Sequence, residues 1–185
     1  MRFFISLEIP ENSQEELSDV QHRLMQIIPN IKPTDPDKFH LTIAFVGEQP
    51  DELKDPLIDV LKRSVEGIKP FTITPAYIDG FPSLHHANVL WVGVKGDIDK
   101  LFRIRERIKD GLISLQMDAD ERRFVPHIAL GKTPKFTLSP EQELEIEKLE
   151  QLQFDPITVS SIKLFESIAN EGFHAHNTLA EIKLI

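Results

Sequence analysis

The stretch that decides the fold is His40-Leu41-Thr42-Ile43-Ala44-Phe45. Successive side chains of a β-strand point to opposite faces, so the imidazole and the hydroxyl share one face while the leucine and isoleucine share the other. One face is therefore apolar, and the other carries groups suited to proton transfer. A similar run, His127-Ile128-Ala129-Leu130, stands in the second half of the chain. Two such histidines facing one cleft would suit the acid and the base of a phosphoester reaction.

Composition limits what such a site can belong to. The chain has 185 residues, a mass of 21.2 kDa and 41% apolar residues, enough for the core of one domain. It has no cysteine, which excludes disulfides, thiolate zinc sites and a cysteine nucleophile and fits a cytoplasmic protein. The net charge of −9 argues against broad neutralisation of nucleic acid, so an RNA partner would be gripped locally at its end. Residues 1–9 are too short an apolar run, broken by Glu8, for a signal peptide or membrane span.

Hydrophobic periodicity and cap signals predict alternating strands and helices. Two capping boxes are expected to open helices, one at Ser13-Gln14-Glu15-Glu16 and one at Ser139-Pro140-Glu141-Gln142. The predicted elements in chain order are a strand over 2–9, a helix from 13, a strand over 39–46, a helix over 51–66, a strand over 71–74, a strand over 89–94, a helix over 97–112, a strand around 127, a helix from 139, a strand from 157 and a strand over 177–185.

This order repeats once along the chain. A strand-helix-strand-helix-strand unit covers approximately residues 1–80 and again 88–170, which predicts one domain over 1–185 with two similar lobes related by a pseudo-twofold axis. The two histidines would then meet in the groove between the lobes. We expect each lobe's connections to return within it, and no glycine-rich turn follows a strand. The prediction is therefore an α+β fold with mainly antiparallel sheets and helices on the outer faces, not a doubly wound fold.

Several segments together resemble the LigT-like family, the RNA 2',3'-cyclic phosphodiesterases also called 2'-5' RNA ligases, in the 2H phosphoesterase superfamily. The resemblance covers nearly the whole chain in order. It is carried by Arg2-Phe3-Phe4-Ile5-Ser6-Leu7-Glu8-Ile9-Pro10, by His40-Leu41-Thr42-Ile43-Ala44-Phe45-Val46-Gly47, by Gly80-Phe81-Pro82 ahead of Val89-Leu90-Trp91-Val92-Gly93, and by Pro126-His127-Ile128-Ala129-Leu130.

The resemblance implies a bilobal α+β fold, no metal or other cofactor, and hydrolysis of a 2',3'-cyclic phosphate end of RNA or a nucleotide to a 2'-phosphate. The two motif histidines of the family fall on His40 and His127, and its first motif threonine falls on Thr42. The second motif threonine is replaced by Ala129, which departs from the family pattern. A basic residue that the family often carries is matched by Lys132.

The remaining site residues are expected around the phosphate. Phe45 would stack on a base, Thr42 would donate to a phosphate oxygen, and Lys132, helped by Arg122 or Arg123, would offset its charge. His176 stands near the place where relatives often carry a tyrosine before Thr-Leu. We assign His127 as the base and His40 as the acid, and the pseudo-symmetry leaves the opposite assignment open.

Three functions stay open at this point. The first is a metal-independent phosphodiesterase that works as a monomer. The second, motivated by Ala129, is a weakened module that binds a phosphate end without turning it over. The third is a phosphodiesterase for another cyclic phosphate or a 2'-5' linkage. No metal site is expected at His85-His86 or at His174 and His176, because neither pair has an acidic or cysteine partner at a recognised spacing. The chain also lacks a complete ATP-binding or nucleotidyl-transfer motif, so ligation would only be the reverse of the cyclic-phosphate chemistry.

Overall fold

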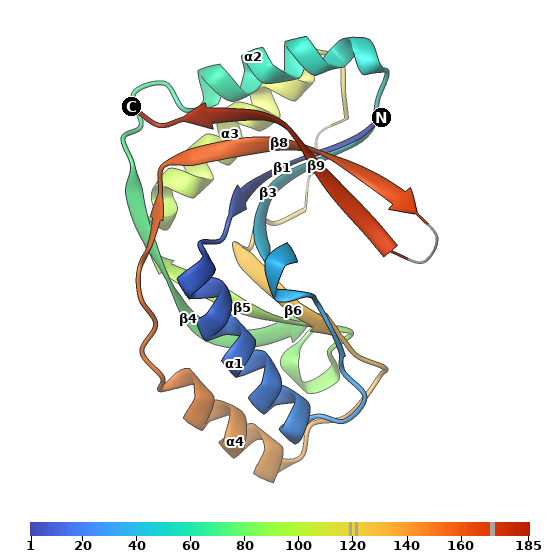
Figure 1. Ribbon diagram of the computed structural model, residues 1–185, viewed down its shortest axis with the longest axis vertical. Helices are drawn as coiled ribbons and strands as arrows, with labels where there is room; N and C mark the ends of the chain where they lie inside the picture. The colour runs from blue at the N-terminus through green and yellow to red at the C-terminus, as the bar shows by residue number, and fades with distance from the viewer. Residues whose placement is uncertain (119, 121, 171–172) are drawn as a thin grey trace.

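The computed structural model describes residues 1–118, 120, 122–170 and 173–185 (Figure 1). Strands and helices alternate along most of the chain. The α-helices are α1 (Glu11–Ile27), α2 (Lys54–Ser64), α3 (Ile98–Ser114) and α4 (Pro140–Glu150). Short 3-10 turns are η1 (Pro36–Lys38), η2 (Asp51–Leu53) and η3 (Leu84–His86). The strands are β1 (Arg2–Glu8), β2 (Lys32–Pro33), β3 (His40–Glu48), β4 (Phe71–Phe81), β5 (Val89–Gly96), β6 (His127–Lys132), β7 (Ile157–Val159), β8 (Ser161–Asn170) and β9 (Phe173–Lys183).

The strands form one curled sheet in which every described pairing is antiparallel. Its order is β7-β4-β5-β6-β3-β1-β8-β9, and β2 adds to the edge of β6. The α+β class and the antiparallel pairing are therefore confirmed. The expectation of separate sheets is wrong, because β3 and β6 join the two halves through the pair Leu41 and Ile128. Each of these two side chains is fully buried, so the joint belongs to the core.

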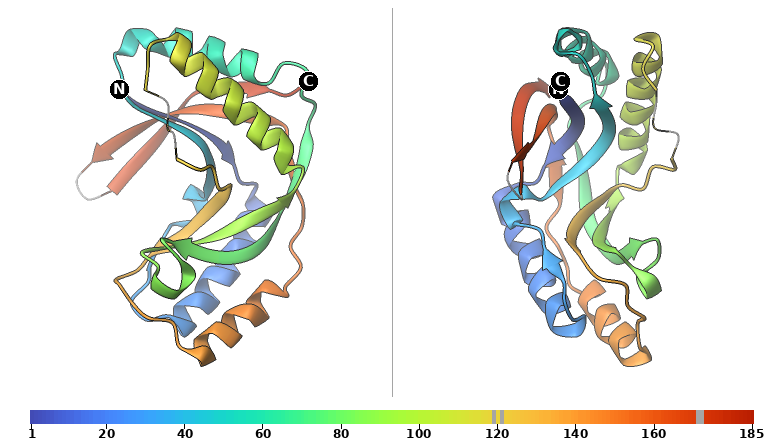
Figure 2. Two further views of the ribbon diagram at one scale, coloured as in Figure 1. Left: turned by 180° about the vertical axis from the view of Figure 1, so that it is seen from behind. Right: turned by 90° about the vertical axis from the view of Figure 1, so that its right-hand side faces the viewer.

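The helices cover the sheet in pairs that mix the two halves of the chain. Helices α2 and α3 pack together at the end of the molecule that carries β3, β1, β8 and β9, while α1 and α4 pack together at the end that carries β6, β5, β4 and β7 (Figures 1 and 2). The expectation that connections return within each lobe is wrong. Helix α1 and strand β4 leave the first half of the chain for the second half-sheet, and α3 and β8 cross in the other direction.

The two predicted capping boxes have different outcomes. The box at Ser139 is confirmed: its side chain accepts from the Gln142 N–H, and the Gln142 side chain accepts from the Ser139 N–H. The box at Ser13 is wrong, because α1 already begins at Glu11, after Pro10. Ser13 therefore lies within the helix, where its hydroxyl is buried.

Several predicted strands have different bounds from those observed. The strand expected over 177–185, for example, is observed as Phe173–Lys183. Strand β4 continues past Pro75 to Phe81. Pro75 still pairs with Val94, and the register then shifts by one residue, so that Ala76 has no partner on β5. The single strand expected from Ile157 is two strands, with β7 beside β4 and β8 beside β1.

Within the described part of the chain, no helix is both long and apolar enough to cross a bilayer.

Candidate functional site

A cavity of about 560 Å³ opens beside the joint between β3 and β6. His40 and His127, the first residues of these two strands, both line it, and so do Thr42 and Ala129. The antiparallel pairing of Leu41 with Ile128 accounts for this. Side chains alternate along a strand, so the residues that flank Leu41 and those that flank Ile128 all point to the face of the sheet away from these two core residues. The structure therefore brings together in one cavity the two histidine motifs that stand far apart in the sequence.

Both histidines are oriented in the same way. The His40 Nδ1–H donates to the Lys38 carbonyl at 2.8 Å, and the His127 Nδ1–H donates to the Val125 carbonyl at 2.6 Å. A carbonyl oxygen only accepts, so Nδ1 carries the proton in each ring. In the neutral imidazole Nε2 is then left as the basic nitrogen, and in the charged imidazole it becomes a second donor. A backbone carbonyl two residues upstream thus prepares each ring to take or give a proton at Nε2.

The surroundings of both rings favour the neutral imidazole. Burial lowers the pKa of His40 below its ordinary value, the hydrogen bond to the Lys38 carbonyl opposes this shift, and the nearby charge of His127 lowers the pKa further. Burial also lowers the pKa of His127, against an opposing effect of the Val125 carbonyl. The contribution of His127 to the pKa of His40 means that protonating one ring disfavours protonating the other.

Phe45 lines the same cavity and is 55% exposed. Strict alternation along β3 would put it on the core face with Leu41 and Ile43. The register against β1 shifts at Ile43, where β3 has one residue more than its partner, and both Ile43 and Ala44 are buried. This bulge restores Phe45 to the face of His40, so the exposed ring is available to a ligand.

The cationic side chains are distributed differently from the sequence prediction. Lys132 does not line the histidine cavity and lies at the end of β6, beside β2. Arg122 and Arg123 both line the cavity, but Arg122 is committed to Asp120 by two hydrogen bonds of 2.9 and 2.8 Å. This contact lowers the pKa of the Asp120 carboxyl to about 2. Arg123 is therefore better placed than Arg122 to meet an anion.

Arg105 is a site residue that the sequence did not reveal. It projects from α3 into the cavity wall, where its guanidinium donates to the Ile43 carbonyl at 2.6 Å and to the Asp120 carbonyl at 3.2 Å. The guanidinium also lies 4.7 Å from the centre of the Phe124 ring. Arg105 thereby ties the loop before β6 to strand β3. An arginine on a surface helix carries no local signal of such a role.

Aromatic rings surround each histidine. The His127 ring lies 4.9 Å from Phe81 and 5.3 Å from Trp91, centre to centre. The His40 ring lies 5.6 Å from Phe4 and 5.5 Å from His176, which meets it edge-on. Such rings exclude water from part of each imidazole, in agreement with the lowered pKa values. Phe81 and Trp91 belong to the quoted family segments, but their contact with His127 is visible only in three dimensions.

In the part of the chain that the structure describes, no group of three or more histidine, cysteine, aspartate or glutamate side chains is arranged to hold a metal ion. His85 approaches Glu143 at 3.8 Å as a single pair. The side chain of His174 lies outside the described residues.

The fold and the cavity define the class of this protein: an α+β protein whose curled antiparallel sheet presents two histidines to one cleft. Residues 7–91 match the family model described as LigT like Phosphoesterase. The RNA 2',3'-cyclic phosphodiesterase of Methanocaldococcus jannaschii is 29% identical over 167 residues, covering 90% of this chain and 91% of that protein. The enzyme of the same name from Thermotoga maritima is 27% identical over 160 residues, 86% of this chain and 82% of that protein.

Solved structures share the fold over the whole chain. The protein TT0787 of Thermus thermophilus superposes with a TM-score of 0.78 at 20% identity, covering 100% of this chain and 98% of that one. Escherichia coli LigT complexed with 3'-AMP superposes with a TM-score of 0.75 at 20% identity, covering 99% and 97%. The chain is thus similar in sequence to the LigT-like phosphoesterases over most of its length, and it shares their fold.

Proposed function

We propose that this protein is a metal-independent phosphodiesterase that opens the 2',3'-cyclic phosphate at an RNA or nucleotide end and leaves a 2'-phosphate. The observation that carries the proposal is the presence of His40 and His127 in one cavity, each with Nδ1 bonded to a carbonyl. Relatives that match over most of their length are named RNA 2',3'-cyclic phosphodiesterases, which supports the reaction class.

The reaction needs one base and one acid on opposite sides of phosphorus. In our assignment His127 Nε2 takes a proton from water as the water oxygen bonds to phosphorus. The bond from phosphorus to the ribose 3'-oxygen breaks in line, and protonated His40 gives its Nε2 proton to that oxygen. The product is a 2'-phosphate. The two Nδ1 hydrogen bonds hold each ring in the tautomer that these transfers require.

Other cavity residues are suited to the charge and the base of the substrate. The Thr42 hydroxyl would donate to a non-bridging phosphate oxygen, and Arg123 would offset the negative charge that the transition state spreads over the phosphate. Phe45 offers an exposed ring on which a base can stack without regard to its identity. None of these three roles depends on Lys132, which lies outside this cavity.

The test is hydrolysis of adenosine 2',3'-cyclic phosphate in the presence of EDTA, with the product identified as the 2'- or the 3'-phosphate. We expect 2'-AMP. His40→Asn and His127→Asn each retain an amide that can donate to the upstream carbonyl but lack Nε2, and each should lower kcat by about 10² to 10⁴. Melting curves of both variants separate a loss of chemistry from a loss of folding. Full activity of either variant, or activity only with added metal, would contradict the proposal.

A second candidate function is recognition of a phosphate end without turnover. Ala129 favours it, because the cavity lacks the hydroxyl that the family places at this position. This module would bind the cyclic nucleotide in wild type and in both asparagine variants and release no product from any of them. Hydrolysis is also measured on a 2'-5' linked dinucleotide and on other cyclic phosphates. Faster turnover of one of these than of the 2',3'-cyclic nucleotide would identify a phosphodiesterase with a different substrate.

A further inference from the structure

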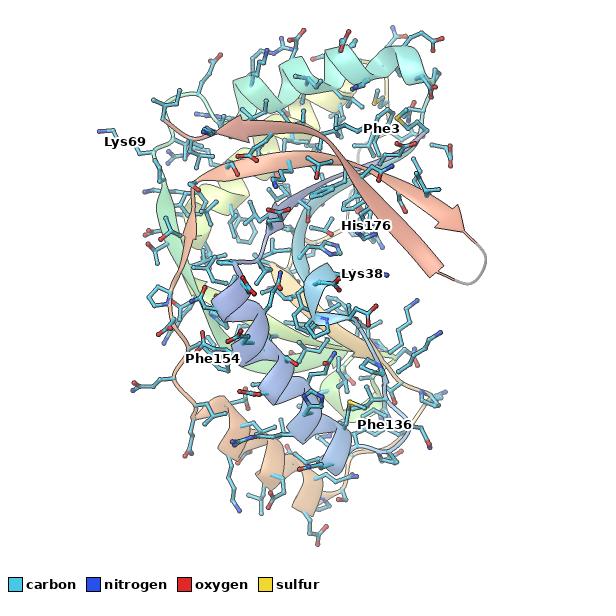
Figure 3. The ribbon with its side chains drawn as sticks, viewed as in Figure 1. Phe3, Lys38, Lys69, Phe136, Phe154 and His176 are labelled. Carbon is cyan, nitrogen blue, oxygen red and sulfur yellow. The ribbon has the colours of Figure 1, made fainter. Side chains whose placement is uncertain are left out.

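A second cavity, of about 780 Å³, adjoins the histidine cavity. Thr34, Lys38, His40 and Phe45 line both, so a ligand that occupies the first reaches the second without crossing a wall. The second cavity extends from His40 towards β2 on one side and towards His176 of β9 on the other. Figure 3 shows His176 and Lys38 close together at the opening between β9 and η1. The volume of the second cavity lies in the range of ordinary small-molecule sites.

Cations gather around this second cavity although the protein as a whole is acidic. Arg2, Lys32 and Lys132 line it and are exposed, and across the described residues none of these three side chains has an ion-pair or hydrogen-bond partner. Lys38 also lines it, 3.7 Å from Asp35. The net charge of the chain is −9, so the gathering of Arg2, Lys32 and Lys132 here is not a consequence of composition. It favours a bound anion.

The placement of two of these lysines is the strongest sign. Lys32 of β2 stands directly opposite Lys132 of β6 in an antiparallel pair. Like charges at directly opposed positions destabilise a sheet, because their Cβ atoms lie only about 4.5 to 5.5 Å apart. A negatively charged group between the two side chains would remove this cost. An anionic ligand therefore accounts for a pairing that the fold alone does not favour.

Rings line the passage between the two cavities. Phe45 borders both and is 55% exposed. His176 lies 4.9 Å from Phe4 and 5.5 Å from His40, measured between ring centres, and forms part of the wall of the second cavity. Exposed rings beside cationic side chains are the elements from which single-stranded nucleic acid sites are made, with bases on the rings and phosphates on the cations.

We propose that the second cavity is a subsite for the RNA strand upstream of the cyclic phosphate. Lys32 and Lys132 hold the phosphodiester that joins the terminal nucleotide to its 5' neighbour, and Phe45 stacks on a base at the passage. The preferred substrate is then an oligonucleotide end and not a free cyclic mononucleotide. This inference rests on the proposed function, since it takes the reacting phosphate to lie between the two histidines.

The experiment compares kcat/KM for ApA ending in a 2',3'-cyclic phosphate with kcat/KM for adenosine 2',3'-cyclic phosphate. We expect the dinucleotide to be preferred by at least about tenfold, a factor typical of one or two charge-assisted contacts. Lys32→Gln and Lys132→Gln should each lower the ratio of the two constants severalfold. The preference of the wild type should also shrink as salt is raised, because phosphate contacts release counterions.

Lys69→Gln is the matched control. It makes the same change of charge at an exposed position far from both cavities (Figure 3), so the ratio should stay at the wild-type value. Equal efficiency on the two substrates, or a ratio that falls as much for Lys69→Gln as for Lys32→Gln, overturns the subsite and leaves the proposed function in place.

A binding measurement separates the two proposals if neither substrate is hydrolysed. A dinucleotide with a terminal 3'-phosphate is titrated calorimetrically against wild type and Lys32→Gln. Binding that weakens in Lys32→Gln but not in Lys69→Gln supports the subsite although the proposed function fails. Binding that is indifferent to Lys32 overturns the subsite as well.

Discussion

Leu41 of β3 lies directly opposite Ile128 of β6, and this pair joins the two halves of the sheet. Continuing the antiparallel register by one residue in each direction sets Thr42 across from His127 and Ala129 across from His40. The two histidines thus have different neighbours: a hydroxyl stands across from His127, and a methyl group stands across from His40. The symmetry suggested by the repeated sequence is therefore broken at residue 129, which is alanine where the first motif has Thr42.

This difference predicts the effect of restoring the hydroxyl. Ala129→Thr would add a donor to the cavity beside His40, and we expect kcat for the cyclic nucleotide to rise by at least about tenfold, since one such donor is often worth about 10² to 10³. Ala129→Val has the shape of threonine without the hydroxyl and should give no such increase. Steady-state kinetics of the three proteins check the prediction. A similar rise in the valine variant would mean that shape, not hydrogen bonding, limits the wild type.

The assignment of acid and base can be tested with a modified leaving group. A substrate whose 3'-bridging oxygen is replaced by sulfur leaves as a thiolate, which needs no proton. If His40 is the acid, His40→Asn should regain most of its lost rate on this substrate while His127→Asn stays slow. Rescue of His127→Asn instead would exchange the two roles.

The pH dependence of the reaction follows from the buried rings. Activity requires one neutral and one protonated imidazole, and the pKa of both His40 and His127 is lowered below the ordinary value of 6.5. We therefore expect kcat/KM to be greatest below about pH 6.5 and to fall as the pH rises above that value, because the acid loses its proton. Measurements from about pH 5 to about pH 8 decide this. A maximum above about pH 7 would contradict it.

The same lowered pKa values predict acid sensitivity of the fold. Between about pH 6.5 and the lower pKa of the folded protein, the unfolded chain binds more protons than the folded one. The contribution of the two neutral histidines to the free energy of unfolding is therefore complete above about pH 6.5, and it is lost as the pH falls through their pKa values in the folded protein. In urea titrations His40→Asn should lose less stability than wild type over this interval. An equal loss in the two proteins would show that other groups are responsible.

A close contact between two helices predicts that substitutions at two residues are coupled. Gly111 of α3 faces Val60 of α2, and a Cβ at residue 111 would lie 2.6 Å from Val60 Cγ1. Gly111→Ala should destabilise the protein, because overpacking costs about 1 to 3 kcal/mol and exceeds the gain of up to about 1 kcal/mol in helix propensity. In a Val60→Ala background both Cγ atoms are removed and only the Cβ of residue 60 stays close, at 3.2 Å, so Gly111→Ala should destabilise the protein much less than it does in the wild type. Thermal unfolding of the four proteins completes the cycle, and stabilisation of the wild type by Gly111→Ala would exclude the clash.

Sequence patterns predicted what depends on local periodicity. The strand at His40, the helix cap at Ser139 and the antiparallel α+β class follow from alternation, cap chemistry and the repeat. The exchange of α1 and α3 between the half-sheets did not follow, because a helix has the same amphipathic pattern whichever sheet it covers. Ser13 shows the same limit: a capping pattern in sequence does not exclude a start one turn earlier.

The two histidines of the candidate site could be predicted from the sequence, whereas several of the other residues that line the cavities could not. Motif spacing indicated His40 and His127, and the pairing of β3 with β6 brings them together. The exposure of Phe45 depends on a bulge, which strict alternation does not reveal. Arg105 reaches the first cavity from α3, which is remote in sequence, so only the tertiary structure could identify it. His176 is already indicated by the sequence, and the structure places its ring beside His40.

The exchange of helices has a consequence for the integrity of the chain. A cut between β4 and β5 would give two fragments. In the N-terminal fragment α1 would lack the half-sheet that contains β6, and in the C-terminal fragment α3 would lack the half-sheet that contains β3. Each fragment alone would expose apolar surface, whereas the two produced together would be able to rebuild the sheet and the cavity between β3 and β6. Each fragment would carry one of the two histidines that line this cavity, so the cavity would form only when the fragments assemble.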